Sequence, residues 1–365
     1  MFYGILASVL GLGLAATAAQ GCGQIHQIKS GETLGKIAQD RLNDSAAYSV
    51  IYDLNKALIG PDPNVIEIGM TLSLPCGASG DTPAAAAPPD WSALLSPAGL
   101  ADLKTDPAIQ IVDLRSAKAA ASGVIPGALP VPYSRWRGAK DNPGRPPTDA
   151  QLSTLIGETG LRLDRPIVLI HTKADPFDMG RAAYVYWLLK SVGAPRIAIL
   201  EGGHAAWAAA KLPLADMPAA PEPYEIALTM SDRWYASLAD VEDIGAGHTR
   251  GHLLDGRPSG MFAKRNDQGQ SVPSTLPGAA SMPAPGFYRL MGAEMPELEM
   301  LTHLKAQSVL WEAQPVVTFC NTGELGALTW FYASELTGIE NVKLYPESTK
   351  GWLAAGLELV VPSLN

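Results

Sequence analysis

The chain has 365 residues, 47% of them hydrophobic and 17% charged, which is enough for two or three globular domains with sizeable cores. Its formal net charge is −9 and no run of basic residues occurs, so the composition argues against nucleic acid and against an anionic membrane surface as partners. The three cysteines are Cys22, Cys76 and Cys320.

Residues 1–20 predict a secretory signal peptide. The segment is apolar from Ile5 to about Ala16, and small residues with Ala-x-Ala-like spacing follow up to Ala19. A membrane anchor is the alternative, but the apolar run is shorter than the roughly 20 residues that span a bilayer. We therefore expect an exported, periplasmic protein whose signal peptide is cleaved.

The next segment predicts the order strand, helix, helix, strand. Ile25–Ile28 alternate as in a strand, and SGETLGKIAQ leads into a helix. A second helix covers about Tyr48 to Leu58, and MTLSLP returns as a strand after the break at GPDPN. This βααβ order, with the stretches SGETLGKIA, DLNK and DPNVIEIGMTLSLP, resembles the LysM module and covers residues 22–76.

The LysM resemblance implies a glycan-binding module. LysM modules bind glycans that contain N-acetylglucosamine, such as peptidoglycan, between the first strand–helix turn and the loop after the second helix. The matching positions in this chain are Gly31, Glu32, Thr33, Leu34, Pro63, Asn64, Val65 and Ile66. The alternative is a LysM fold that binds no glycan and serves as a spacer.

Cys22 and Cys76 bracket this module. Disulfides form in oxidising compartments, where export would place both residues, so we predict a Cys22–Cys76 disulfide. Cys320 is then left over, either as an inert core residue or as a reactive thiol. Residues 77–90, GASGDTPAAAAPPD, are rich in alanine and proline and predict a semi-rigid linker.

The rest of the chain contains two copies of one pattern. Five stretches of the first copy correspond to five of the second: IQIVDLR to HLLDGRP, GVIPGALPVP to STLPGAASMP, PIVLIH to PVVTFC, GRAAYVYWLL to GALTWFYASEL, and AILEGGHAAW to VKLYPESTKGW. The offset is 142 residues from Asp113 to Asp255, 149 from Pro166 to Pro315 and 145 from Trp207 to Trp352. Short apolar strands alternate with helical patterns, which predicts two α/β domains with parallel central sheets, over residues 91–220 and 221–365.

Cys320 stands at the end of an apolar strand, just before a helix that begins near Leu325. In such an arrangement the loop N–H groups and the helix N-terminus surround the sulfur, and Gly323 allows the loop to turn these donors inward. Both features favour a thiolate over a thiol and would stabilise a persulfide anion in the same way. The chemistry that suits such a site is sulfur transfer in two displacements.

The strand ends DLR and DGRP, the turns IPGA and LPGA, and the loop CNTGEL resemble the rhodanese (sulfurtransferase) family in its tandem two-domain form. The resemblance covers residues 91–365. It implies a catalytic Cys320 that opens a six-residue loop completed by Asn321, Thr322, Gly323, Glu324 and Leu325. It also implies a catalytically silent first repeat, in which His171 stands where the cysteine would fall and the domain buttresses the second.

Charges near this loop bear on donor binding. The loop has no positive side chain, so Arg257 in DGRP is the candidate substrate-binding residue, although it could instead pair with a carboxylate to fix the fold. Lys264, Arg265 and Lys350 are further positive candidates. We expect the Glu324 carboxylate to disfavour the thiolate and to repel a dianionic donor.

The leading hypothesis is a monomeric periplasmic sulfurtransferase without cofactor or metal. It would pass sulfane sulfur from thiosulfate or 3-mercaptopyruvate to a thiol or cyanide-like acceptor, and LysM could localise it on peptidoglycan. The alternative, which Glu324 supports, is a non-catalytic cell-wall-binding scaffold or sulfur carrier with degenerate rhodanese units. A cysteine phosphatase is a weaker hypothesis, because Gly326 stands where that chemistry needs an arginine.

Overall fold

The computed structural model describes residues 21–42, 45, 48–75, 91–138, 142, 144–173, 175–216, 218–284 and 314–363. By its internal contacts the chain divides into two units, Met1–Pro83 and Ala84–Asn365. The predicted signal peptide and the predicted linker lie outside the described residues and stay predictions.

The N-terminal unit consists of a strand, two helices and a strand. β1 (Gly21–Gln27) pairs antiparallel with β2 (Thr71–Pro75), and α1 (Leu34–Leu42) and α2 (Tyr48–Ile59) lie between them in the sequence. The LysM identity of this unit stays a prediction. Its small apolar core is formed by Ile28, Leu34, Ile37, Ala38, Ile51, Ile59 and Leu72.

The first repeat is built on a five-stranded sheet in the order β3-β7-β6-β4-β5, in which every neighbouring pair is parallel. All residues of β6 and β7 are buried, as expected for strands covered on both faces. The strands are β3 (Leu94–Leu95), β4 (Gln110–Asp113), β5 (Ala128–Pro130), β6 (Ile167–Ile170) and β7 (Ile197–Leu200). The helices are α3 (Pro97–Leu103), α4 (Ala117–Ala120), α5 (Asp149–Thr159), α6 (Pro176–Ser191) and α7 (Gly203–Ala209), with a 3-10 turn η2 (Tyr133–Trp136).

The second repeat is built on a four-stranded parallel sheet in the order β11-β10-β8-β9. Together the two sheets confirm the predicted α/β class with parallel central sheets. The strands are β8 (His252–Asp255), β9 (Ala279–Ser281), β10 (Val316–Phe319) and β11 (Val342–Leu344). The helices are α8 (Leu238–Gly245), α9 (Ser259–Phe262), α12 (Glu324–Phe331) and α13 (Ser348–Ala354), with the 3-10 turn η3 (Asp232–Trp234) and the π-helical segment η4 (Tyr332–Leu336).

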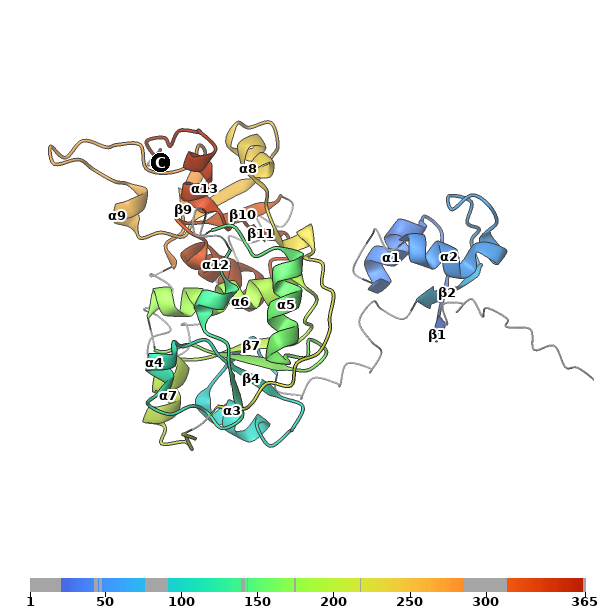
Figure 1. Ribbon diagram of the computed structural model, residues 1–365. Helices are drawn as coiled ribbons and strands as arrows, with labels where there is room; N and C mark the ends of the chain where they lie inside the picture. The colour runs from blue at the N-terminus through green and yellow to red at the C-terminus, as the bar shows by residue number, and fades with distance from the viewer. Residues whose placement is uncertain are drawn as a thin grey trace, which may run out of the picture. The chain divides into compact units, whose positions relative to one another are not determined.

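The helices α6 and α12 follow the equivalent strands β6 and β10, and they pack against each other between the two sheets (Figure 1). Both are apolar on nearly every side, which is typical of fully buried helices. Gly180 permits the close approach, because a Cβ atom there would lie 2.7 Å from the backbone oxygen of Glu324. One apolar cluster includes Trp187 of α6 and Trp330 of α12, so the two repeats share a core.

Polar contacts cross the same interface. Nζ of Lys190 lies 2.6 Å from Oε1 of Glu335, and the hydroxyl of Tyr186 donates to Oε2 of Glu335 at 2.8 Å. The Lys190 ammonium also lies over the Trp234 ring, 4.5 Å from its centroid. These contacts tie η4, which continues directly from α12, and η3 to α6 of the first repeat.

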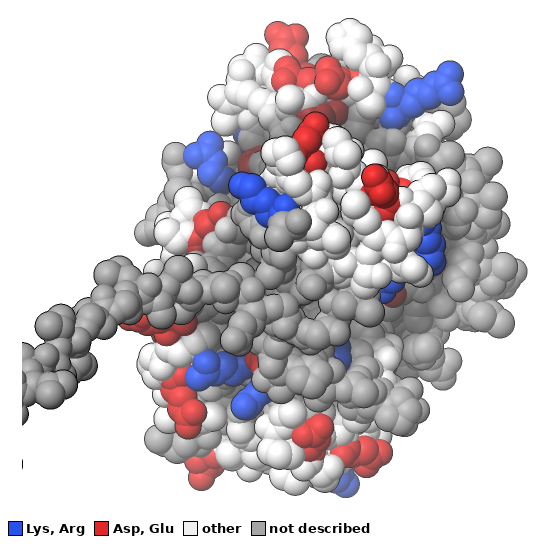
Figure 2. All heavy atoms as spheres, turned by 90° about the vertical axis from the view of Figure 1, so that its right-hand side faces the viewer, with Lys and Arg blue, Asp and Glu red and all other residues white. Residues whose placement is uncertain are grey.

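The surface shows charges of both signs. On the face that Figure 2 presents, acidic and basic side chains of the described residues are interspersed rather than gathered by sign. Within the described ranges, no helix combines the length and the apolar character needed to cross a membrane.

Candidate active site around Cys320

Cys320 lies between the end of β10 and the beginning of α12. β10 is an interior strand, flanked by β8 and β11, and it ends at the residue before Cys320. α12 begins at Glu324, so residues 321–323 form the whole connecting loop. The cysteine is 3% exposed. The predicted strand–loop–helix arrangement is therefore confirmed.

Backbone N–H groups converge on the sulfur. The amide nitrogen of Gly323 lies 3.2 Å from Sγ of Cys320, and the N–H groups of Thr322 and Gly326 also favour the charged form of the thiol. Gly323 has φ +97°, and a Cβ atom there would lie 2.9 Å from the backbone oxygen of Pro346. Only glycine fits this turn without strain, and the predicted cradle of donors is present.

The net electrostatics differ from the sequence-based expectation. Burial raises the pKa of the Cys320 thiol, and the Glu324 carboxylate raises it further. The N–H groups of the cradle lower this pKa, but burial and Glu324 outweigh them. The predicted effect of the cradle therefore has the expected direction, but burial, which the sequence did not predict, opposes it: removal of the sulfur from water disfavours its charge more than the three N–H groups favour it. The predicted effect of Glu324 on the thiol has the expected direction.

Ser348 is a residue at the cysteine that sequence reasoning missed. Its hydroxyl accepts the N–H of Cys320 at 3.0 Å, donates to the carbonyl of Tyr345 at 3.0 Å and lies 4.0 Å from Sγ. Its φ is +56°, a conformation that is unfavourable for serine. At the matching position of the first repeat stands Gly203, with φ +62°. Because serine adopts here a conformation that favours glycine, we infer that its hydroxyl contributes to the site by accepting the N–H of Cys320.

Arg257 is held by a buried carboxylate and by the cysteine loop. Its Nε lies 2.9 Å from Oδ1 of Asp255, and its Nη1 donates to the side-chain oxygen of Asn321 at 3.1 Å. In the first repeat, Arg115 makes the same Nε contact with Asp113 at 2.9 Å. The pairing is thus a brace common to both domains, which in the second also orients the loop. A direct role of Arg257 in donor binding stays a prediction.

The other basic candidates lie in different surroundings. The guanidinium of Arg265 donates to the carbonyl of Gly269 at 2.7 Å, and Lys264 is exposed. Lys350 is also exposed, but its backbone N–H donates to the carbonyl of Asn321 at 3.2 Å. Of these three, Lys350 is therefore the residue that a hydrogen bond ties to the cysteine loop.

Glu324 faces residues of the first repeat. Its Oε1 accepts the hydroxyl of Tyr133 at 3.1 Å and lies 3.6 Å from Nη1 of Arg137, while its Oε2 accepts the hydroxyl of Thr322 at 2.6 Å. Arg137 also donates through Nη2 to the carbonyl of Thr322 at 2.8 Å. Sequence reasoning missed Tyr133 and Arg137, because nothing in YSRWRG indicates contact with a loop of the other repeat.

The first repeat has the same backbone arrangement around a histidine. The N–H of His204 donates to the carbonyl of His171 at 2.8 Å, just as the N–H of Thr349 donates to the carbonyl of Cys320 at 3.1 Å. His171 therefore occupies the position of the cysteine, as the repeat alignment predicts. Because imidazole cannot form a persulfide, this position carries no sulfur.

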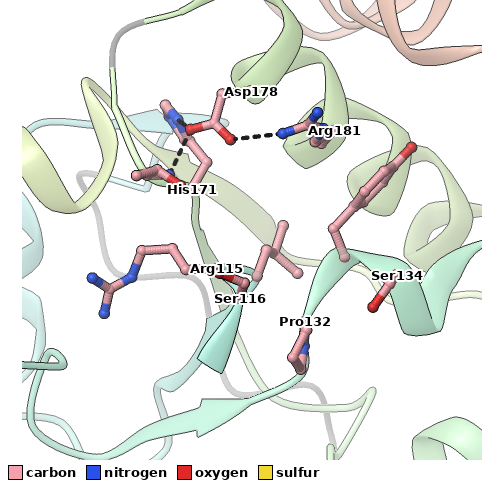
Figure 3. A pocket seen from close by; sticks show the side chains of 10 residues that line it. Arg115, Ser116, Pro132, Ser134, His171, Asp178 and Arg181 are labelled. Carbon is pink, nitrogen blue, oxygen red and sulfur yellow. Dashed lines mark hydrogen bonds and ion pairs between the residues drawn. The ribbon is translucent and has the colours of Figure 1, made fainter. Parts of the chain in front are cut away.

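Asp178 occupies the cradle of the first repeat (Figure 3). Its Oδ2 accepts the N–H groups of Thr172 at 2.6 Å and Lys173 at 2.9 Å, and it lies 3.5 Å from Nδ1 of His171. Lys173 corresponds to the loop residue Thr322 of the second repeat. Burial alone would raise the pKa of Asp178, but these hydrogen bonds lower it below its ordinary value. The N–H groups that could hold a sulfur anion are therefore already used by a carboxylate of α6.

A pocket of about 210 Å³ opens beside this cradle. Arg181 and Asp178 both line this pocket. Nη1 of Arg181 lies 3.5 Å from Oδ1 of Asp178, and the side chain of Arg181 is about half exposed. Figure 3 shows Asp178 between His171 and Arg181. The lining residues are Leu114, Arg115, Ser116, Pro132, Tyr133, Ser134, His171, Thr172, Asp178 and Arg181.

In the N-terminal unit, the first predicted glycan-binding turn is well ordered by its own contacts. Gly31 has φ +81°, and the carboxylate of Glu32 lies 2.8 Å from Nε2 of His26. The hydroxyl of Thr33 accepts an N–H three residues further on, as at a helix start. The side chain of Leu34 is buried in the core of the unit, so it is not exposed to contact a glycan.

The second predicted glycan-binding loop runs from Pro63 to Ile66. Asn64 donates to Oδ1 of Asp62 through both its backbone N–H, at 2.9 Å, and its side-chain amide, at 3.0 Å. Val65 is exposed, and Ile66 packs against the core of the unit. Glycan binding by these two loops stays a prediction.

Cys76 lies outside the described residues, as does the side chain of Cys22, so their disulfide stays a prediction. Among the described side chains, no group of three or more His, Cys, Asp or Glu could hold a metal ion.

The fold and the cysteine loop together define a tandem α/β protein with a single cysteine between a strand and a helix of its second repeat. The family model of the rhodanese-like domain matches residues 96–210 and 239–355, which make up more than half of the chain. The chain belongs to the rhodanese-like domain family and contains two copies of the domain.

This chain is similar to several sulfurtransferases. It is 35% identical over 145 residues to the thiosulfate sulfurtransferase of Azotobacter vinelandii, covering 40% of this chain and 52% of that protein. It is 24% identical over 182 residues to the human 3-mercaptopyruvate sulfurtransferase, covering 49% and 60%. The crystal structure of SseA from Escherichia coli, a 3-mercaptopyruvate sulfotransferase, superposes with a TM-score of 0.58 at 22% identity, covering 70% of this chain and 98% of SseA. That last likeness shows the shared fold.

Proposed function

We propose that this chain is a sulfurtransferase that carries sulfane sulfur as a persulfide on Cys320. The observation that carries the proposal is the position of Sγ at the start of α12, with the N–H of Gly323 at 3.2 Å. An anion at this position is stabilised by oriented N–H dipoles in both the thiolate and the persulfide state. The names of the relatives support the same reaction class.

The reaction runs in two displacements. The Cys320 thiolate attacks the outer sulfur of the donor, and the bond from that sulfur to the rest of the donor breaks. When thiosulfate is the donor, sulfite leaves with the bonding electron pair. When 3-mercaptopyruvate is the donor, the enolate of pyruvate leaves with this pair and then takes up a proton. In the second step a thiolate or cyanide attacks the outer sulfur of the persulfide, and the Cys320 thiolate is released.

Mass spectrometry of the intact protein tests this mechanism. After incubation with thiosulfate or 3-mercaptopyruvate, the wild type should gain the mass of one sulfur atom and should lose it on addition of cyanide or a thiol. Cys320→Ser should gain no sulfur and should catalyse no transfer, while its thermal unfolding stays close to that of the wild type. A serine variant with wild-type turnover would contradict the mechanism.

A non-catalytic role is the second candidate. The burial of Cys320 to 3% exposure and its raised pKa favour it, because both reduce the fraction of reactive thiolate. In that case the protein would be a cell-wall-binding scaffold or a sulfur carrier. Uptake of sulfur from the donor without release to any acceptor would support the carrier role, and no uptake would support the scaffold.

The proposed location is the periplasm, with the N-terminal unit bound to peptidoglycan as a LysM module. Full-length mature protein should co-sediment with purified peptidoglycan, and substitutions at Thr33 and Asn64 should weaken the sedimentation. Absence of sedimentation by the wild type would favour the spacer role. N-terminal sequencing of protein recovered from the periplasm would locate the predicted cleavage near residue 20. We also propose that the protein is a monomer, which light scattering after gel filtration would test.

A further inference from the structure

We propose that Arg137 of the first repeat is a positioning residue of the active site in the second repeat. In this role it holds the carbonyl of Thr322 and offsets the charge that Glu324 places beside Cys320. The meaning of this role for sulfur transfer rests on the proposed function, but the state of the cysteine can be measured without any transfer.

The contacts of Arg137 reach two residues of the cysteine loop. Nη2 donates to the carbonyl of Thr322 at 2.8 Å, and Nη1 lies 3.6 Å from Oε1 of Glu324. The guanidinium packs over the ring of Tyr184 on α6, 4.7 Å from its centroid. The side chains of Arg137 and Glu324 are 13% and 20% exposed, so solvent screens their interaction less than it would at the surface.

Tyr133 links the two charged groups. Nη1 of Arg137 donates to the phenol oxygen at 2.9 Å, and the phenol donates to Oε1 of Glu324 at 3.1 Å. The second carboxylate oxygen accepts the hydroxyl of Thr322 at 2.6 Å. Burial, reinforced by the Glu324 charge, raises the pKa of Tyr133 well above its ordinary value, so the phenol stays a neutral donor.

An acidic residue in this loop requires such a partner. A carboxylate near Sγ opposes ionisation of the thiol, whereas the N–H cradle and the start of α12 favour it. Arg137 and Glu324 together carry no net charge. The carboxylate therefore opposes ionisation of the Cys320 thiol less than it would alone, and the N–H cradle has less to overcome. The first repeat, although it lacks a cysteine, thereby supplies a charge that the second repeat's site uses.

Other titratable groups near the loop do not replace Arg137. Arg181 lies over the Tyr133 ring but pairs with Asp178, and the charge of Arg145 acts on Glu347. Tyr184 stays neutral, because burial raises its pKa. Arg257 is compensated by Asp255 at the end of β8. Burial also raises the pKa of Glu347, whose Oε1 accepts the hydroxyl of Tyr235 at 2.9 Å, and Lys350 is solvent-exposed.

The test is the rate of Cys320 alkylation by iodoacetamide as a function of pH, in the full-length protein without donor or acceptor. Arg137→Met should slow alkylation at neutral pH about tenfold and move the profile to higher pH, because Glu324 is then uncompensated. Glu324→Gln should accelerate it several-fold. Arg137→Lys, which keeps the charge, should retain a profile near that of the wild type.

The double variant Arg137→Met/Glu324→Gln distinguishes charge compensation from simple bracing. It lacks both charges, so its profile should return to within about threefold of the wild type at neutral pH. A double variant as slow as Arg137→Met, or an unchanged profile in Arg137→Met, would overturn the proposal. If the Arg137 variants do not fold, Glu324→Gln alone decides, and a profile equal to that of the wild type would overturn it. Because alkylation needs no sulfur transfer, failure of the proposed function would leave this result readable.

Discussion

The hydroxyl of Ser348 accepts the backbone N–H of Cys320 at 3.0 Å, although serine adopts there the left-handed conformation that Gly203 has in the first repeat. The hydrogen bond satisfies the buried backbone donor of Cys320, and the backbone conformation costs energy for any residue with a Cβ atom. The two effects can be separated by two substitutions.

Ser348→Ala should lower the free energy of unfolding by about 1–3 kcal/mol, because it keeps the strained conformation and leaves the N–H of Cys320 without its acceptor. Ser348→Gly loses the same hydrogen bond but relieves the backbone, so it should be about 1 kcal/mol more stable than the alanine variant. Urea denaturation measures both. An alanine variant as stable as the wild type would contradict the structural role of the hydroxyl.

The raised pKa of Cys320 predicts a specific pH dependence. Thiolate is the reactive form, and its fraction rises with pH until the pKa is passed. Because burial and Glu324 place that pKa above the ordinary thiol value, the single-turnover rate of sulfur uptake from thiosulfate should still increase well above neutral pH. Quenched-flow mixing followed by mass spectrometry measures this rate, and Cys320→Ser serves as the blank. A rate that is already constant in mildly acidic buffer would contradict a raised pKa of Cys320 in the reacting protein.

The core shared by the two repeats predicts one unfolding transition for residues 91–363. The indole N–H of Trp187 donates to the carbonyl of Trp234 at 2.8 Å, which joins the first repeat to the beginning of the second. Trp187→Ala should lower the free energy of unfolding by about 3–5 kcal/mol and destabilise both repeats together. Calorimetry should show a single shifted peak for them, whereas Phe177→Ala, at a half-exposed position of α6, should shift it little. Two separated peaks for the repeats would contradict a common core.

The filled cradle of the first repeat predicts that a cysteine alone cannot activate it. In a Cys320→Ser background, His171→Cys should react slowly with iodoacetamide, because the carboxylate of Asp178 holds the N–H groups and opposes a thiolate. Adding Asp178→Ala should free these donors and raise the alkylation rate about tenfold at neutral pH. Equal rates with and without Asp178 would mean that the carboxylate does not control this cradle.

The predicted disulfide can be tested by counting thiols. Export to an oxidising compartment should pair Cys22 with Cys76 and leave Cys320 reduced, so denatured but unreduced periplasmic protein should show one free thiol per chain. The bond would close a loop long enough to stabilise the small module by about 2–4 kcal/mol. Three free thiols would contradict the pairing. Cys320→Ser, which should show none, is the matched control.

Several elements followed from local pattern alone. The strand before Cys320 and the helix after Gly323 are encoded by apolar runs and by glycine, which act on neighbouring residues, and the parallel sheets follow from the repeat of the whole unit, which can be seen in the sequence. The position of His171 in place of the cysteine followed from the same repeat, and the hydrogen bonds of His204 and Thr349 confirm it. These predictions required no knowledge of how the two domains meet.

The charge state of the site depended on contacts between distant parts of the chain. Arg137 lies 185 residues before Thr322 in the sequence, and only the packing of α6 against α12 brings the two together. Burial of Sγ, which decides the direction of the Cys320 pKa, likewise results from the shared core and not from the loop. The sequence by itself therefore determined the strands and helices, because these are set by local periodicity, and it placed Cys320 between a strand and a helix. The tertiary structure alone decided which charges face Cys320, because electrostatic interactions act through space and depend on burial.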